Sequence, residues 1–420
     1  MYICVSIRPT VEIEKVMRRN LLLGILSVII IITSYSHFTD EPTQAVLTAS
    51  SDSTYHETAG ENVSVEDSIN ALIETFNFDL KEHVIDSIFQ RRAKHNAFNG
   101  VILAAQKGQV IYEEAFGWAN TSKKEKMQKD HVFQLASVSK QFTAASVMLL
   151  KQKGLLAYED TIQQYIPNFP YEGITIRQLL THRSGLPNYI YKAEEYYPKS
   201  YHHDSVVSNE EIMEMLIADP PNKYGQPDGR FLYSNTGYIV LASIVEEVSG
   251  LPFDVFLKKE IFEPLGMKNT FARSVQTPKE QLEKVVQGYT ARRRPYRDYF
   301  LDTVMGDKSV YSTAYDMFLW DKALLDGTII QKDILADAFE KGSPKKRGKY
   351  NYGFGYRLYE TTDGKTVVYH TGWWKGFSTL FVHYPESESC LIILTNRLNK
   401  SYYNINMVLD TLAIPEYHRT

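Results

Sequence analysis

The stretch that decides the fold of this chain is Phe133-Gln-Leu-Ala-Ser-Val-Ser-Lys-Gln-Phe-Thr-Ala144. From Ser137 onward the apolar residues recur with helical spacing, and this pattern ends at Gly154. Lys140 follows Ser137 by three positions, so both side chains project from one face of the predicted helix. A serine hydroxyl becomes a good nucleophile only when a neighbour takes its proton, and a lysine one turn away can do so. The spacing therefore predicts a nucleophile at Ser137 and a base at Lys140, although a capping serine beside a surface lysine gives the same pattern.

The second motif is Tyr233-Ser-Asn235, in a loop that leads into an apolar helix. Close to Lys140 the anionic form of a phenol would be favoured, which makes Tyr233 a candidate acid or base. The amide of Asn235 would hold either the substrate carbonyl or the lysine. On its own, the triplet also fits a loop tyrosine that an asparagine caps.

The third motif is His370-Thr-Gly372, at the end of a predicted strand. A glycine in this place allows a substrate backbone to approach the strand closely. The backbone amide of Trp373 would pair with that of Ser137 as an oxyanion hole. The Trp373 ring is either a wall of the substrate site or part of the core. Taken alone, the triplet is an ordinary strand end.

The remaining patterns predict one α+β domain over residues 79–415. Near its start, two strand-like runs form a hairpin around Gln106-Lys-Gly-Gln109, and strand patterns return near the C-terminus. We therefore expect an antiparallel sheet flanked by helices, built from about 79–140 and 305–415. A mainly helical domain is expected as an insertion over about 141–304.

Residues 1–37 have the pattern of a secretory signal peptide, with basic residues, an apolar run over Leu21–Ile32 and small serines near the end. As a helix, this run would be about 18 Å long, which is too short for a bilayer core of about 30 Å. An uncleaved membrane anchor is the alternative interpretation. Residues 38–78 are rich in Ser, Thr, Glu and Asp and predict a flexible linker. The sequence thus predicts an exported protein, either periplasmic or secreted.

Composition excludes several functional classes. The chain has 420 residues, of which 44% are hydrophobic and 23% charged, as in globular proteins. The formal net charge of −4 argues against a nucleic-acid partner. Two cysteines, and no His-Glu-x-x-His spacing, predict that there is no metal site, and no cofactor is expected. The oligomeric state is left open.

Together and in this order, Ser-x-x-Lys, Tyr-Ser-Asn and His-Thr-Gly resemble the motifs of class C β-lactamases, D-Ala-D-Ala carboxypeptidases and related esterases. The resemblance covers about residues 80–415 and includes further family segments at 174–186, 261–267 and 310–316. It implies an acyl-enzyme on Ser137, with proton transfer by Lys140 and Tyr233. The other matched residues would bind the substrate: Asn235, His370, Thr371, Gly372 and Trp373.

Two departures from the family pattern stand out. The β-lactamase members usually have lysine where this chain has His370, and a neutral histidine has no fixed charge with which to bind a carboxylate. The segment Met305-Gly-Asp-Lys-Ser-Val310 has fewer glycines than many relatives have before the Tyr-Ser-Thr triplet. His182, in Thr-His-Arg-Ser-Gly, is expected to be structural.

The sequence therefore predicts an exported serine hydrolase that cleaves an ester or an amide. Its substrate is either a D-amino-acid peptide, such as the peptidoglycan stem, or a small carboxylic ester. A true β-lactamase and a non-catalytic scaffold that kept the fold are the alternatives, and the intact Ser, Lys, Tyr and Asn argue against the scaffold. A membrane is a partner only if the N-terminal segment stays uncleaved.

Overall fold

The structure, a computed structural model, describes residues 65–344, 348–398 and 404–417. The predicted signal peptide and most of the predicted linker lie outside the described residues. The linker prediction is wrong over 65–78, because the first described helix, α2 (Val65–Lys94), includes these residues. In this stretch Val65, Ile69, Leu72 and Phe76 recur with helical spacing among polar residues, although Ile73 and Phe76 are exposed in the helix. The polar residues between them are also typical of a linker, which is why composition alone misassigned this part.

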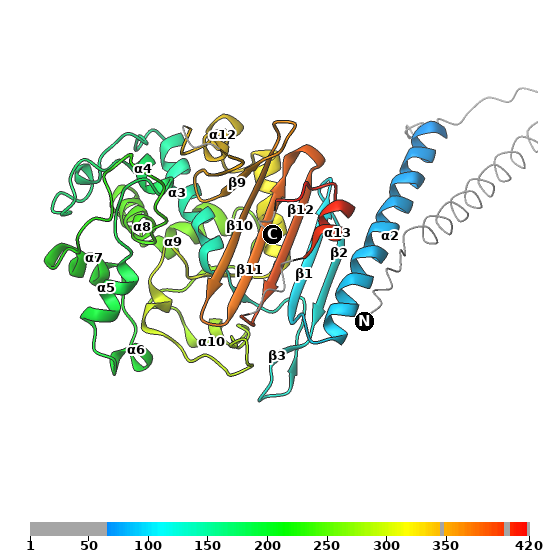
Figure 1. Ribbon diagram of the computed structural model, residues 1–420, viewed down its shortest axis with the longest axis horizontal. Coiled ribbons are helices and arrows are strands. Elements are labelled where there is room, and N and C mark those ends of the chain that lie inside the picture. The colour runs from blue at the N-terminus through cyan, green and yellow to red at the C-terminus, as the bar shows by residue number, and fades with distance from the viewer. Residues whose placement is uncertain (1–64, 345–347, 399–403, 418–420) are drawn as a thin grey trace, which may run out of the picture. The chain divides into compact units, whose positions relative to one another are not determined.

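A seven-stranded antiparallel sheet forms the centre of the domain (Figure 1). The first and last strand-forming parts of the chain meet in it, with Val101 opposite Leu394. The predicted hairpin is present, with Gln106 opposite Gln109. In spatial order the strands are β2 (Gln109–Phe116), β1 (Gly100–Gln106), β12 (Ser389–Thr395), β11 (Phe377–Tyr384), β10 (Thr366–Trp374), β9 (Arg357–Glu360) and β8 (Tyr350–Tyr352).

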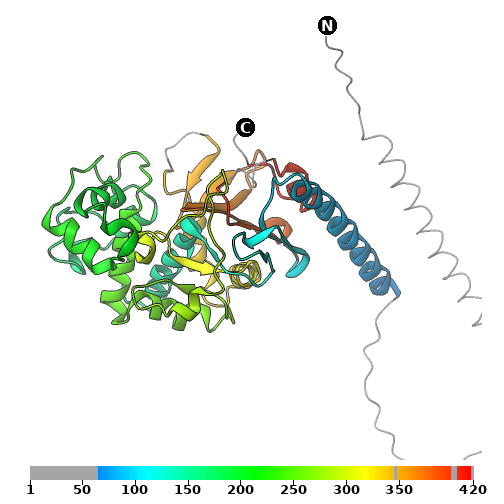
Figure 2. The same cartoon turned by 90° about the horizontal axis from the view of Figure 1, so that it is seen from below.

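Helices cover both faces of the sheet (Figures 1 and 2). Side chains alternate between the faces along each strand, so β12 sends Ile392 and Leu394 to one core and Leu391 and Ile393 to the other. The smaller core is completed by α2 and α13 (Asn406–Thr411), and the larger by α3 (Lys140–Gln152) and α11 (Ala314–Asp326). This arrangement confirms the predicted α+β fold.

The middle of the chain is mainly helical, as expected. Its helices begin and end with recognisable signals: Thr175 and Gln178 form a capping box at the start of α4, and Gly250 ends α8 in the left-handed conformation. The helices between residues 141 and 340 are α4 (Ile176–Leu180), α5 (Tyr189–Tyr196), α6 (Tyr201–Asp204), α7 (Asn209–Ala218), α8 (Thr236–Ser249), α9 (Phe253–Leu257), α10 (Lys279–Leu282), α11 and α12 (Lys332–Phe339).

Three packing contacts assemble the region around Ser137. Helix α3 packs against α8, and β10 packs against η1 (Ala136–Ser139), the 3₁₀ turn that precedes α3. A small sheet of β5 (Phe133–Gln134), β7 (Val310–Ser312) and β6 (Phe271–Ala272) places the chain before Ser137 beside residues 310–312. In the described part of the chain, no helix is both long and apolar enough to cross a membrane.

Candidate active site

Ser137 lies in the 3₁₀ turn η1, and the α-helix begins only at Lys140. The residue before it, Ala136, is buried and has a φ of +50°, a left-handed conformation that costs energy in a residue other than glycine. Ser137 itself is partly exposed, whereas Lys140 is 0% exposed. The turn thus holds the serine hydroxyl at the surface of the site and the amine directly beneath it.

The amine of Lys140 has three oxygen neighbours. Its Nζ lies 3.2 Å from Ser137 Oγ, 2.9 Å from Asn235 Oδ1 and 2.7 Å from the backbone carbonyl of Asp307. The amide oxygen and the carbonyl only accept hydrogen bonds, and a neutral amine has two N–H donors and one lone pair. When both donors point at these acceptors, the lone pair faces Ser137 Oγ. The geometry therefore suits Lys140 to take the serine proton.

Tyr233 contacts the same hydroxyl from the loop before α8. Its OH donates to Ser137 Oγ at 3.0 Å, and its ring centroid lies 5.0 Å from Lys140 Nζ. Ser137 Oγ therefore has an amine on one side and a phenol donor on the other. A proton that leaves Ser137 at Lys140 can be balanced by one that Tyr233 supplies to a leaving group.

His182 supports the Tyr233 ring, with a centroid distance of 4.2 Å. Its Nδ1 accepts from the backbone N–H of Ser234 at 3.3 Å, while its buried Nε2 has no hydrogen-bond partner in the described part of the chain. Burial, followed by the charge of Lys140, holds the pKa of His182 well below its usual value. His182 is thus an uncharged positioning residue behind Tyr233, a role that its sequence context alone did not reveal.

His370 is buried behind the site and is likewise neutral. Its Nδ1 donates to the carbonyl of Thr371 at 2.8 Å, which leaves Nε2 to accept from the Tyr352 hydroxyl at 3.0 Å. Burial, followed by the charges of Arg357 and Lys140, holds the pKa of His370 well below its usual value. Its ring centroid lies 6.5 Å from that of Tyr233, so His370 packs against the phenol that contacts Ser137.

Gly372 allows the strand to approach the nucleophile turn rather than a substrate. A Cβ at this position would lie 2.2 Å from the carbonyl oxygen of Leu135 and 2.1 Å from Thr379 Oγ1. The next residue, Trp373, is 62% exposed, which excludes the core as the place of its ring. Thr371, the residue between His370 and Gly372, is half-buried.

The strand that carries these residues has an open edge. β9 pairs only with Thr366–Tyr369 of β10, whereas β11 continues along the other edge to Trp374. Beside Thr371 and Trp373, backbone groups of β10 therefore face a side with no paired strand in the described part of the chain.

Arg357, on β9, is a residue that the sequence analysis missed, since it lies in an ordinary strand pattern. Its guanidinium carbon lies 5.6 Å from the centroid of the Tyr233 ring. Its Nε is buried and has no hydrogen-bond partner among the described residues. The site thus has a guanidinium beside Tyr233, although its third motif has the neutral His370 and no lysine.

No cluster of His, Cys, Asp and Glu in the described part of the chain could hold a metal ion.

Comparison with known proteins agrees with this geometry. A family model described as Beta-lactamase matches residues 85–409. Penicillin-binding protein 4* of Bacillus subtilis (strain 168) is 33% identical over 335 residues, which cover 77% of this chain and 73% of that protein. The putative penicillin-binding protein PbpX of the same organism is 26% identical over 313 residues, 73% of each chain.

Solved structures show the same fold. The octameric penicillin-binding protein homologue from Pyrococcus abyssi has a TM-score of 0.68 at 24% identity and covers 79% of this chain and 77% of its own. The D-amino acid amidase from Ochrobactrum anthropi SV3 has a TM-score of 0.64 at 24% identity, covering 79% and 96%. The family model spans most of the domain, and the structure brings Ser137, Lys140, Tyr233 and Asn235 into one site. The chain is a serine hydrolase of the β-lactamase family.

Proposed function

We propose that this hydrolase cleaves D-amino-acid peptides that end in a free carboxylate, through an acyl-enzyme on Ser137. The observation that carries the chemistry is that Lys140 Nζ and Tyr233 OH both contact Ser137 Oγ, at 3.2 and 3.0 Å. Lys140 takes the proton as Ser137 attacks the carbonyl carbon, and Tyr233 protonates the leaving amine. Water then attacks the acyl-enzyme by the reverse path. The backbone amides of Ser137 and Trp373 bind the oxyanion.

Two features support a peptide with a carboxylate as the substrate. The unpaired edge of β10 offers backbone groups with which an extended peptide can pair. Arg357 supplies a half-buried cation beside Tyr233, and a guanidinium binds a carboxylate through two parallel hydrogen bonds. The fold shared with a D-amino acid amidase and a penicillin-binding protein homologue is consistent with such a substrate.

A small carboxylic ester is the second candidate. The ring of Trp373 is 62% exposed beside the third motif, and it offers an apolar wall to an uncharged acyl group. The protein EstCE1, a hydrolase with promiscuous acyltransferase activity, shares the fold at a TM-score of 0.67 and 20% identity. We further propose that the protein is exported, because residues 1–37 have the basic and apolar pattern of a signal peptide.

Labelling and turnover together test the proposal. A fluorophosphonate or a fluorescent penicillin should label the wild type at Ser137, which peptide mapping locates, and should not label Ser137→Ala. The wild type should release D-alanine from a peptide ending in D-Ala-D-Ala faster than from the same peptide with an amidated C-terminus. An enzyme that treats both peptides equally, or that cleaves only a nitrophenyl ester, contradicts the proposed substrate.

Arg357→Met is the matched variant, because it keeps the length of the side chain and removes the charge. It should raise KM for the free-acid peptide by roughly ten- to a hundredfold, the value of a charged hydrogen bond. KM for the amidated peptide and for the ester should change little. An equal loss for all three substrates would assign Arg357 a structural role instead.

A further inference from the structure

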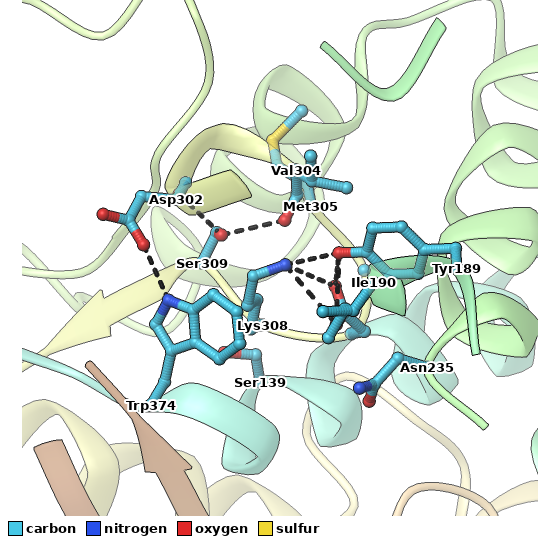
Figure 3. A network of polar contacts seen from close by, with 12 residues as sticks. Ser139, Tyr189, Ile190, Asn235, Asp302, Val304, Met305, Lys308, Ser309 and Trp374 are labelled. Atoms are coloured by element: carbon cyan, nitrogen blue, oxygen red, sulfur yellow. Dashed lines mark hydrogen bonds and ion pairs between the residues drawn. The ribbon is translucent and has the colours of Figure 1, made fainter. Parts of the chain in front are cut away.

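The segment Met305–Val310, which departs from the family pattern, carries a second buried lysine close to Lys140. The side chain of Lys308 is 3% exposed, and its Nζ lies 3.3 Å from Asp307 Oδ1. It also donates to the phenol oxygen of Tyr189 on α5 and lies 4.9 Å from the centroid of the Trp374 ring. Figure 3 shows the Lys308 amine between the Tyr189 phenol and the Trp374 indole. The indole N–H of Trp374 donates a hydrogen bond to Asp302 Oδ1.

The segment is held rigidly on both sides of Asp307. A Cβ on Gly306 would lie 2.3 Å from the carbonyl oxygen of Tyr238, so the backbone packs directly on α8. Ser309 has a φ of +74°, and its Oγ lies 2.7 Å from the carbonyl of Asp302 and 2.8 Å from that of Val304. These contacts fix the direction of the Asp307 carbonyl, the group that accepts a hydrogen bond from Lys140.

The charged side chains of Met305–Val310 also act on Lys140 through their electric field. Burial lowers the pKa of Lys308, while the carboxylates of Asp307 and Asp302 oppose this shift. The Asp307 carboxylate is 2% exposed, and Lys308 is its ion-pair partner. If Lys308 lost its charge, the buried Asp307 carboxylate would keep the hydrogen bond from the Tyr189 hydroxyl, 3.3 Å away, but would lose its cation. The carbonyl of the same residue binds Lys140. A negative charge in this place favours the ammonium form of Lys140, which cannot accept a proton.

We propose that Lys308 is a positioning residue for the reaction at Ser137: by pairing with Asp307, it keeps Lys140 free to accept the serine proton. This inference rests on the proposed function, because it assigns a task to Lys140 as a base. The charged and titratable groups that face Lys308 are Asp307 from its own segment, Tyr189 from α5, Asp302 from η4 (Phe300–Thr303) and Lys140 from α3.

The test measures the rate at which a fluorophosphonate labels Ser137, as a function of pH, in the full-length protein. In Lys308→Met the acid limb of the profile should move to higher pH by about one unit, so that the rate at neutral pH falls about tenfold. In Asp307→Asn/Lys308→Met, which has the same methionine but no unpaired carboxylate, the limb should return towards its wild-type position. KM for a nitrophenyl ester should stay unchanged in both, because Lys308 touches no substrate.

The comparison separates charge from packing. Equal losses in the single and double variants, or a lower rate with an unmoved acid limb, would show that Lys308 is merely structural and would overturn the inference. If Lys308→Met does not fold, Asp307→Asn provides the test, because it leaves the Lys308 amine without its carboxylate. If the acid limb of the labelling profile moves to higher pH in this variant, the inference is overturned. Lys375→Met is the matched control, because it removes an amine 5.3 Å from the Trp374 ring and should leave the limb in place. A wild type that is not labelled at Ser137 would instead refute the proposed function.

Discussion

The two sides of the active site work in different ways. On the helical side, side chains from α3 and the loop before α8 contact Ser137 Oγ directly, as Lys140 and Tyr233 do. On the strand side, His370 makes its hydrogen bonds with Tyr352 and Thr371 and reaches the site only by packing against Tyr233. The helical side therefore holds the groups that we propose for proton transfer, and the strand side holds those that we propose for binding the substrate.

The most severe test of this division is Ser137→Ala. Covalent catalysis disappears with the hydroxyl, so turnover should fall by about 10³-fold or more. The melting curve should be retained, because Ser137 is partly exposed and the change creates no core cavity. Turnover on any substrate that the wild type cleaves checks this, and near-normal turnover in a folded variant would remove Ser137 from the mechanism.

Tyr233→Phe should lower turnover by about a hundredfold, the range of one general acid or base, and should alter the acid limb of the pH–rate profile. Asn235→Ala is its partner test, since Asn235 accepts from Lys140 but does not titrate. It should lower turnover and leave the limb in place. If Tyr233→Phe keeps the wild-type rate and profile, proton transfer depends on Lys140 alone.

His370→Lys tests whether a cation on the strand side of the site changes the preference for substrates with a carboxylate. The wild type should hydrolyse nitrocefin poorly relative to a short nitrophenyl ester, because His370 is neutral and Arg357, the cation that we propose for the carboxylate of a peptide, lies on β9 and not on β10. An ammonium in this place contributes about 1.5–3 kcal/mol through a charged hydrogen bond, so the variant should gain roughly ten- to a hundredfold in preference for carboxylate-bearing substrates. A wild type that prefers nitrocefin would contradict this prediction and would show that Arg357 binds the β-lactam carboxylate as well.

The smallest expected effect is on stability at acid pH. His182 and His370 are buried, and their pKa values in the folded protein lie well below 6.5. The unfolded chain binds more protons below this pH, so the free energy of unfolding should fall by up to about 1.4 kcal/mol per histidine for each further pH unit. Urea denaturation across this range measures the slope. His370→Gln, which does not titrate, should have a shallower slope, and an unchanged slope would refute the assignment.

Much of this protein could be predicted from its sequence, because the signals were local. Apolar alternation and turn residues identified the sheet, and the spacing of Ser137 and Lys140 placed two side chains on one helical face. The predicted fold and hydrolase class are confirmed. The helix over 65–78 was missed because its polar residues are typical of a linker, although its apolar residues recur with helical spacing.

The tertiary structure decided what no local pattern encodes. The third oxygen neighbour of Lys140 is the backbone carbonyl of Asp307. Every residue type has such a carbonyl, so the identity of this residue could not predict the contact. Arg357 is the first residue of β9 and lies opposite Tyr369 of β10, and this strand pairing places it beside Tyr233. Gly372 serves the approach of β10 to the turn before Ser137, a contact between segments more than two hundred residues apart. Residue type and spacing determine which chemistry a chain can perform, but long-range packing determines which backbone groups and charges surround it.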